Sequence, residues 1–402
     1  MTTSALDYTP KRDRPIASAR ALDPAIAEGK ATGPRRAMLE NARNGLAQPF
    51  KGLSVAGEIE QGLYTIAPTG VSTAPVQQAA RAFLTTLSAE ERAKASFDTD
   101  AQEWRSWSNV HPFLMRHGLC LDYMTPASRE AALQLMEASF SAAGYKEARD
   151  VMRLNYTIGE VTDRLGAEYD EYGEWLYWVS IFGEPSEGGP WGWQIDGHHL
   201  NVSMFVLGDQ MVFTPFFDGS EPVLAPWGKF EGTRVCEAQE AQGLALMQSL
   251  SESQRQEALL KEGLPGEMYA GAFNDNHVMA FAGTPYAGMT SAQQGLLREL
   301  VGTYVMRARD GHNQVWMREI ESHLERTHFG WIGASDDDAV FYYRVHSPVV
   351  LIEFDHQRGV ALDSDVPTRN HIHTIVRTPN GNDYGLDLLR LHYENAAHHR
   401  HD

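Results

Sequence analysis

The sequence has little cysteine: Cys120 and Cys236 are its two cysteines in 402 residues. Two cysteines so far apart do not make a disulfide framework, and no C-x-x-C pair points to a thiolate zinc site or a redox dithiol. A chain of this length has enough residues to bury a core without such cross-links. We therefore expect both cysteines to be buried core thiols.

Basic side chains are also scarce, since 34 Lys and Arg stand against 53 Asp and Glu, for a net charge of −19. The basic footprint of a nucleic-acid-binding protein is missing. The same acidic surplus repels anionic lipid headgroups. These counts argue against nucleic acid and membrane surfaces as partners. They leave a small-molecule substrate as the expected partner, and they leave homo-oligomer formation open.

Long apolar runs are lacking as well. No stretch approaches the roughly 18 apolar residues of a membrane span, and residues 1–50 lack the apolar run of about 7–15 residues of a secretory signal. We therefore expect a cytoplasmic protein. The P-loop, the G-x-G-x-x-G turn, the G-x-S-x-G elbow and the H-E-x-x-H helix are also missing, which excludes the commonest signatures of ATP, NAD(P), serine-hydrolase and zincin enzymes.

What is present is typical of a folded protein, with 43% apolar residues and 10% aromatic residues. Prolines at positions 10, 15, 24 and 34 predict an extended N-terminal arm over residues 1–50. Residues 51–402 are expected to form a single large α+β domain. Its helical part covers about 75–167, and further helices are expected at 237–249, 291–309 and 313–326. Capping-box spacing marks three helix starts, at Ser88/Glu91, Ser251/Gln254 and Thr290/Gln293.

Strand signals fall in two blocks, at about 174–214 and 340–377, where aromatic and β-branched residues gather. Gly208 and Asp209 predict a hairpin turn inside the first block. We expect a mainly antiparallel β-sheet with helices packed around it, chiefly on one side. The segment Asn274 to Gly288 resembles a further strand that ends in a turn.

Histidine is concentrated in the C-terminal third, since 12 of the 16 histidines lie at or after His277. Residues i and i+2 of a strand share a face, so the strand at 371–377 points two imidazoles to one side. If the three strands of the second block are neighbours, one face carries Arg344, His346, Glu353, Asp355, His371, His373 and Arg377. Such a set could bind a divalent metal through two or three imidazoles and a carboxylate. The alternative is a buried ion-pair network with ordinary histidines.

A second candidate segment is PWGWQIDGHHLNVSMFV, in which His198 and His199 follow Gly197. We expect His199 to lead the polar face of the next strand, and His198 to lie at the strand mouth. Trp191 and Trp193 are either the walls of a pocket for a small polar molecule or anchors of the core. Near the C-terminus, Asp383 is expected to cap the last helix.

These motifs, in their order along the chain, also carry a family resemblance. PWGWQIDGHHLNVS, TPFFDGSEP, HFGWIG, FYYRVHSPVVLIEFDHQ and NHIHTIVRTPNGNDYG resemble the uncharacterised family catalogued as domain of unknown function 3500. The resemblance runs from about residue 75 to about residue 396. It implies no established reaction, so the functional hypotheses rest on the chemistry of the residues.

Our first hypothesis is a metal-dependent enzyme, hydrolytic in its reaction, that acts on a small polar or carboxylate-bearing substrate. His371, His373 and one of His198, His199 or His346 would bind the metal. Zinc is the first expectation, because a zinc-bound water is acidified toward neutral pH. Glu353 and Asp355 would move the proton. Arg344 and Arg377 would hold a substrate carboxylate.

Two alternatives use the same residues. Iron or copper at this site would give an oxidoreductase, because two histidines with a carboxylate suit iron and three imidazoles suit copper. Tyr342, Tyr343 and Trp331 would be compatible with oxidative chemistry. The third hypothesis is a metal- or ligand-binding protein without catalysis.

Overall fold

The computed structural model describes residues 6–11, 34–109, 116–165, 171–260 and 263–395. The described residues form one twelve-stranded sheet in the order β1-β3-β4-β5-β7-β12-β11-β10-β9-β8, with β2 beside β3 and β6 beside β5. All described strand pairs except β1–β3 are antiparallel, so the predicted α+β fold with a mainly antiparallel sheet is confirmed. The strands are β1 (Ser96–Phe97), β2 (Leu119–Cys120), β3 (Tyr177–Phe182), β4 (Pro190–Gly197), β5 (Leu200–Leu207), β6 (Gln210–Val212), β7 (Phe216–Ser220), β8 (Thr284–Pro285), β9 (His328–Gly333), β10 (Phe341–His346), β11 (Leu351–Arg358) and β12 (Pro367–Arg377).

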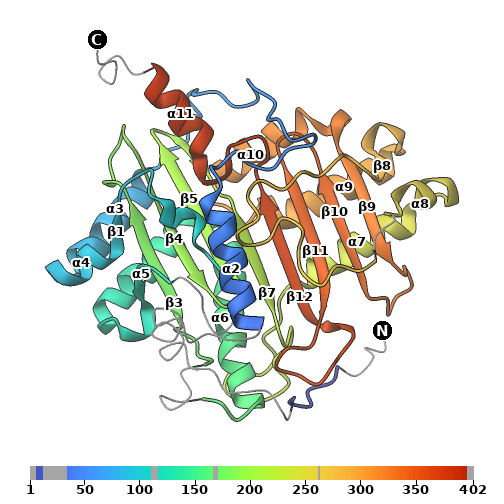
Figure 1. Ribbon diagram of the computed structural model, residues 1–402, viewed down its shortest axis with the longest axis horizontal. Helices are drawn as coiled ribbons and strands as arrows, with labels where there is room; N and C mark the ends of the chain where they lie inside the picture. Colours follow the sequence, from blue (N-terminus) through green and yellow to red (C-terminus); the bar gives the residue numbers. More distant parts are fainter. Residues whose placement is uncertain (1–5, 12–33, 110–115, 166–170, 261–262, 396–402) are drawn as a thin grey trace.

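The helices cover both faces of this sheet, most of them on one. They are α2 (Pro34–Ala47), α3 (Ala74–Thr85), α4 (Ala89–Ala95), α5 (Pro126–Ser139), α6 (Ala142–Val161), α7 (Glu237–Ser249), α8 (Glu252–Ala258), α9 (Ser291–Val305), α10 (His312–Glu321) and α11 (Leu386–Asn395). Figure 1 shows α2 in front of the centre of the sheet, whereas α7 and α9 lie behind it. We call these the α2 face and the α9 face.

Local sequence signals account for several helix starts. All three predicted capping boxes form, at the first turns of α4, α8 and α9. In each box the serine or threonine side chain accepts from the third backbone N–H, and the glutamate or glutamine side chain accepts from the cap residue. The predicted turn at Gly208 and Asp209 joins β5 to β6.

Other expectations fail for a physical reason. The proposed N-terminal arm contains α2, and residues 1–5 and 12–33 lie outside the described residues. The segment Asn274 to Gly288 consists mostly of turns, with Thr284 and Pro285 alone in a short strand. β4 lies inside the first predicted block but shows no alternation of its own, and β7 and β9 lie outside both blocks. Nearly all their residues are buried on both faces, so they lack the alternation of polar and apolar residues that marks a half-exposed strand.

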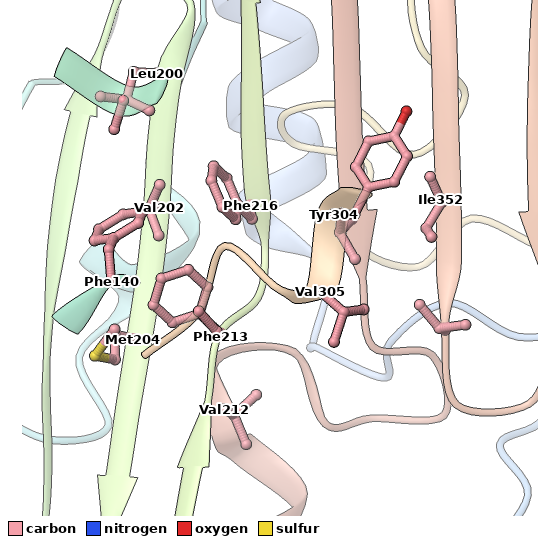
Figure 2. Close-up of a cluster of buried hydrophobic side chains, with 14 of the residues drawn as sticks. Phe140, Leu200, Val202, Met204, Val212, Phe213, Phe216, Tyr304, Val305 and Ile352 are labelled. Atoms are coloured by element: carbon pink, nitrogen blue, oxygen red, sulfur yellow. The ribbon is translucent and has the colours of Figure 1, made fainter. Parts of the chain in front are cut away.

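Most of the apolar core lies on the α9 face of the sheet. Leu200, Val202 and Met204 of β5 lie with Phe216 of β7 against the side chains of Phe140 and Phe213 in Figure 2. Tyr304 and Val305 of α9 and Ile352 of β11 belong to the same cluster. Trp191 and Trp193 are also core residues, at most 1% exposed. Of the two alternatives for these tryptophans, they are therefore anchors of the core.

The α2 face is polar, and it carries the residues expected to share one face of the second block. The register sets Asp355 opposite both His373 and Tyr342, and it sets Glu353 opposite Arg344. β10, β11 and β12 are therefore neighbours, and the predicted common face is confirmed. This face is covered by α2 and by the segments 101–109 and 264–283. Their side chains pack with Phe217 and Ile375, and the backbone N–H of Ala270 donates to Glu353.

Arg377 anchors this cover to the sheet. Its guanidinium is fully buried, and it donates to Asp383 at 2.8 Å, to Asp275 at 2.7 Å and to the Ala270 carbonyl at 2.7 Å. All three of its nitrogens therefore have protein acceptors. Asp383 also accepts from the backbone N–H of Thr378, so it holds Arg377 and does not cap α11 as expected.

This network predicts a large stability effect. Asp383→Ala should lower the free energy of unfolding by about 3–5 kcal/mol, because it leaves a buried guanidinium without one of its carboxylates. Urea denaturation measures the change. Glu394→Ala is the control, since it removes an exposed partner of Arg390 and should cost less than about 1 kcal/mol. An equal loss in the two variants would contradict the structural role of Arg377.

Candidate metal centre

Three histidines from two distant parts of the chain meet at the α2 face. The Nε2 atoms of His199, His371 and His373 lie 3.1–3.2 Å from one another, and each side chain is at most 4% exposed. Among the described residues, they form one of two groups whose ligand atoms all lie within 4.8 Å of one another. We call this group the histidine triad.

Hydrogen bonds alone do not satisfy this geometry. Each Nε2 atom either carries a proton or has a lone pair, so at least two of the three atoms are in the same state. Two donors or two acceptors then face each other at 3.1–3.2 Å in a buried site. A cation bound by three lone pairs removes this conflict. The three Nε2 atoms are close enough together for all of them to bind one ion at the usual metal–nitrogen distance of about 2.0–2.1 Å.

Hydrogen bonding and burial favour binding through Nε2 at two of the imidazoles. The Nδ1 atom of His371 lies 2.6 Å from the Arg358 carbonyl oxygen, so Nδ1 donates, and Nε2 is the atom with the lone pair when the ring is neutral. Burial, followed by the neighbouring His371 and His199, holds the pKa of His373 well below its usual value. Metal binding requires this neutral form.

Backbone structure aims the third imidazole. His199 is the second residue of the two-residue turn between β4 and β5, and its φ of 61° lies in the left-handed region. This conformation is uncommon for a residue with a side chain and costs on the order of 1 kcal/mol or more. His199 thus lies in the turn and does not start the strand, whereas Asn201 of β5 does lie on the polar face.

Carboxylates lie beside the triad. Asp355 is directly opposite His373 in the sheet, and its Oδ1 atom is buried with no hydrogen-bond partner among the described residues. Gln357 donates to its other oxygen. Burial, together with the charges of Glu353 and Glu267, raises the pKa of Asp355 to about 9. Burial also raises the pKa of Glu267, and the nearby His371 offsets part of this increase.

The other residues expected at the site have different partners. Glu353 is fully buried and accepts from the Tyr342 hydroxyl at 2.7 Å and from the Ala270 N–H at 2.8 Å. His198 stacks on His199, with ring centroids 3.9 Å apart, and its Nδ1 bonds to Asn155. His198 therefore lies behind a triad member and outside the group.

His346 and Arg344 lie away from the triad. His346 shares a row of the sheet with Arg377, four residues along β12 from His373, which corresponds to about 13 Å. Burial, together with the positive charge of Arg344, lowers the pKa of His346 to about 3. Arg344 lies opposite Glu353 on β11. Glu353 is two residues away from Asp355 along that strand, so Arg344 does not lie opposite Asp355.

A cavity on the α2 face lies near the triad, separated from it by Phe217, and no triad histidine is among its described lining residues. It has a volume of about 210 Å³, and Phe217 in its wall lies 5.1 Å from His373 between ring centroids. Glu267 also lines it. The rest of its described wall is mainly apolar, with Met38, Met268, Ala272 and Phe273 beside Asn41, Asn109 and Gly271. The sequence pattern missed Glu267 and the contribution of α2, because neither has a motif of its own.

The second ligand group lies on the α9 face and is already satisfied. It consists of Glu147, Asp218 and Cys236. Arg307 forms an ion pair with Asp218, and Glu147 accepts from the backbone N–H of Cys236 at 2.9 Å. Burial raises the pKa of the Cys236 thiol well above its usual value. This group is a structural network, because a buried guanidinium supplies its positive charge.

The triad predicts the outcome of metal analysis. His371→Ala and His373→Ala should each reduce bound metal from about one equivalent to near zero, because two imidazoles hold a divalent ion much more weakly than three. Elemental analysis of protein purified without an affinity tag measures this. His346→Ala is the matched control and should keep the metal. Full occupancy in both triad variants would show that the ligands lie elsewhere.

Comparison with known proteins agrees with the motifs quoted above. No curated protein and no solved structure matches the chain. Residues 69–386 match the family described as "Protein of unknown function (DUF3500)". This match covers most of the chain and includes every member of the histidine triad, so the protein belongs to the DUF3500 family.

Proposed function

We propose that this protein is a metal-dependent hydrolase whose catalytic ion is held by the histidine triad. The observation that carries the proposal is the set of three Nε2 atoms 3.1–3.2 Å apart in a buried site. Three protein nitrogens suit zinc in catalytic sites, where the fourth position holds water or substrate. A structural zinc site uses four protein ligands instead.

The residues around the triad support catalysis. Zinc would acidify its bound water and supply the nucleophile. Asp355 has an oxygen without a described partner, and it lies opposite His373, where it can accept a proton from that water. A nearby cation also favours the ionised carboxylate, so it would lower the pKa of Asp355 from about 9.

The nearby cavity indicates the substrate. Its wall is mainly apolar, and the one charged side chain among its described lining residues is the carboxylate of Glu267. An anionic group would be repelled there. We therefore favour a small, uncharged polar substrate over a carboxylate-bearing one. Arg377 supports this choice, because its three nitrogens already have protein acceptors.

A copper-dependent oxidoreductase is the second candidate, because three imidazoles also suit copper. Iron is less favoured, since its usual site has two histidines and a carboxylate ligand, whereas the triad holds three imidazoles. The aromatic residues considered for oxidative chemistry do not add support. Tyr343 lies on the α9 face, bonded to Tyr304, and Tyr342 donates to Glu353. A metal- or ligand-binding protein without catalysis is the third candidate.

The location is also a proposal. No helix among the described residues combines the length and the apolar character that crossing a membrane requires. Cys120 and Cys236 are buried free thiols, as expected. Free thiols are typical of a reducing compartment, so we propose the cytoplasm.

Asp355 gives the test of the hydrolytic mechanism. In the zinc-loaded protein, Asp355→Asn should lower kcat/KM for 4-nitrophenyl acetate by about 10²–10⁴, because the amide cannot accept the proton. Release of nitrophenolate measures the rate, and elemental analysis should show that zinc is retained. Asp363→Asn removes an exposed carboxylate and should leave the rate unchanged.

The outcomes separate the candidates. Zinc with an activity that depends on Asp355 supports hydrolysis. Stoichiometric copper and an oxidative turnover would favour the second candidate. A bound metal without either activity would favour the third. Folded protein that binds no metal would contradict the first two candidates and leave a ligand-binding role as the third.

A further inference from the structure

A second cavity lies far from the histidine triad. Its volume is about 310 Å³, and it is formed by residues 63–69, β6, α10 and the start of α11. Figure 1 shows α10 and α11 at the same edge of the molecule. His199 comes directly before β5, and Gln210 of this cavity pairs with Leu207, the last residue of β5. The length of β5, about 23 Å, therefore separates the two sites.

Apolar and aromatic side chains make up much of this wall. They include Leu63, Met211, Val315, Trp316 and Leu388. A cavity of this size with an aromatic side chain in its wall is typical of a small-molecule site.

Most polar side chains of the wall are already used by the backbone. Gln210 donates to the Thr65 carbonyl and accepts from the Ala67 N–H. Tyr64 donates to the Pro379 carbonyl at 2.6 Å, and His312 bonds to the Asp209 carbonyl. These groups shape the cavity and hold its rim.

Glu319 is different. It is the one acidic side chain in this wall, and it has no hydrogen bond or ion pair within 4 Å among the described residues. Burial alone raises its pKa to about 7, since no cation opposes the effect. Arg318 is next to it on α10 and also lines the cavity, but it is an exposed residue and has no described ion pair with Glu319. Glu319 is partly exposed, so its carboxylate faces the cavity without a described partner, and an occupant with a positive charge would supply one.

We propose that this cavity binds a small organic ammonium compound, with its cationic nitrogen at Glu319 and its carbon skeleton against Trp316 and the apolar wall. Both the carboxylate and the face of an indole ring attract ammonium groups. A divalent metal fits less well, because it needs several oxygen ligands and the wall offers one carboxylate. The carboxylate of Glu319 disfavours an anion beside it.

Benzylamine is a suitable probe, and benzyl alcohol is its uncharged counterpart of similar shape. At pH 8, isothermal titration calorimetry should show benzylamine binding about tenfold or more tightly than benzyl alcohol, because only the amine pairs with the carboxylate. Glu319→Gln should remove this preference. Glu321→Gln is the matched control, since Glu321 is an exposed residue of the same helix.

Each result is decisive. Equal affinity for the amine and the alcohol, an unchanged preference in Glu319→Gln, or no binding of either probe would overturn the proposal. A thermal melt of Glu319→Gln confirms that the variant is folded. His371→Ala should keep amine binding, which separates this site from the metal centre.

Discussion

The central constraint in this structure is the burial of three imidazoles whose Nε2 atoms face one another. Polar groups without partners are costly inside a protein, and three neutral imidazoles at 3.1–3.2 Å do not satisfy one another fully. A cation turns this cost into a stabilising interaction. The same site without an ion would be a persistent source of strain in the core, and this makes the metal the simplest explanation of the geometry.

The fold supports this centre at three levels. Adjacent strands place His371 and His373 on one face of β12, with Asp355 opposite on β11. The turn between β4 and β5 brings His199 to them in a left-handed backbone conformation. The cover on the α2 face removes the centre from water, and the buried Arg377 network fixes that cover to the sheet. The second and third levels depend on contacts between segments far apart in the sequence.

The parts that could be predicted follow from local rules. Period-two alternation placed His371, His373 and Asp355 on one face, and capping-box spacing located the starts of α4, α8 and α9. What depends on long-range packing was not predictable. β7 and β9 are almost entirely buried, so they lack alternation and lie outside the predicted strand blocks. Glu267 reaches the site from a segment without a motif, and which of His198, His199 and His346 joins the pair is decided by a turn and by strand register.

The account is tested most directly by anomalous X-ray diffraction from crystals of the purified protein, recorded at the absorption edge of the metal that elemental analysis identifies. We expect one strong peak about 2.0–2.1 Å from the Nε2 atoms of His199, His371 and His373. A peak at Glu147, Asp218 and Cys236 instead, or no peak near the three imidazoles, would contradict the account.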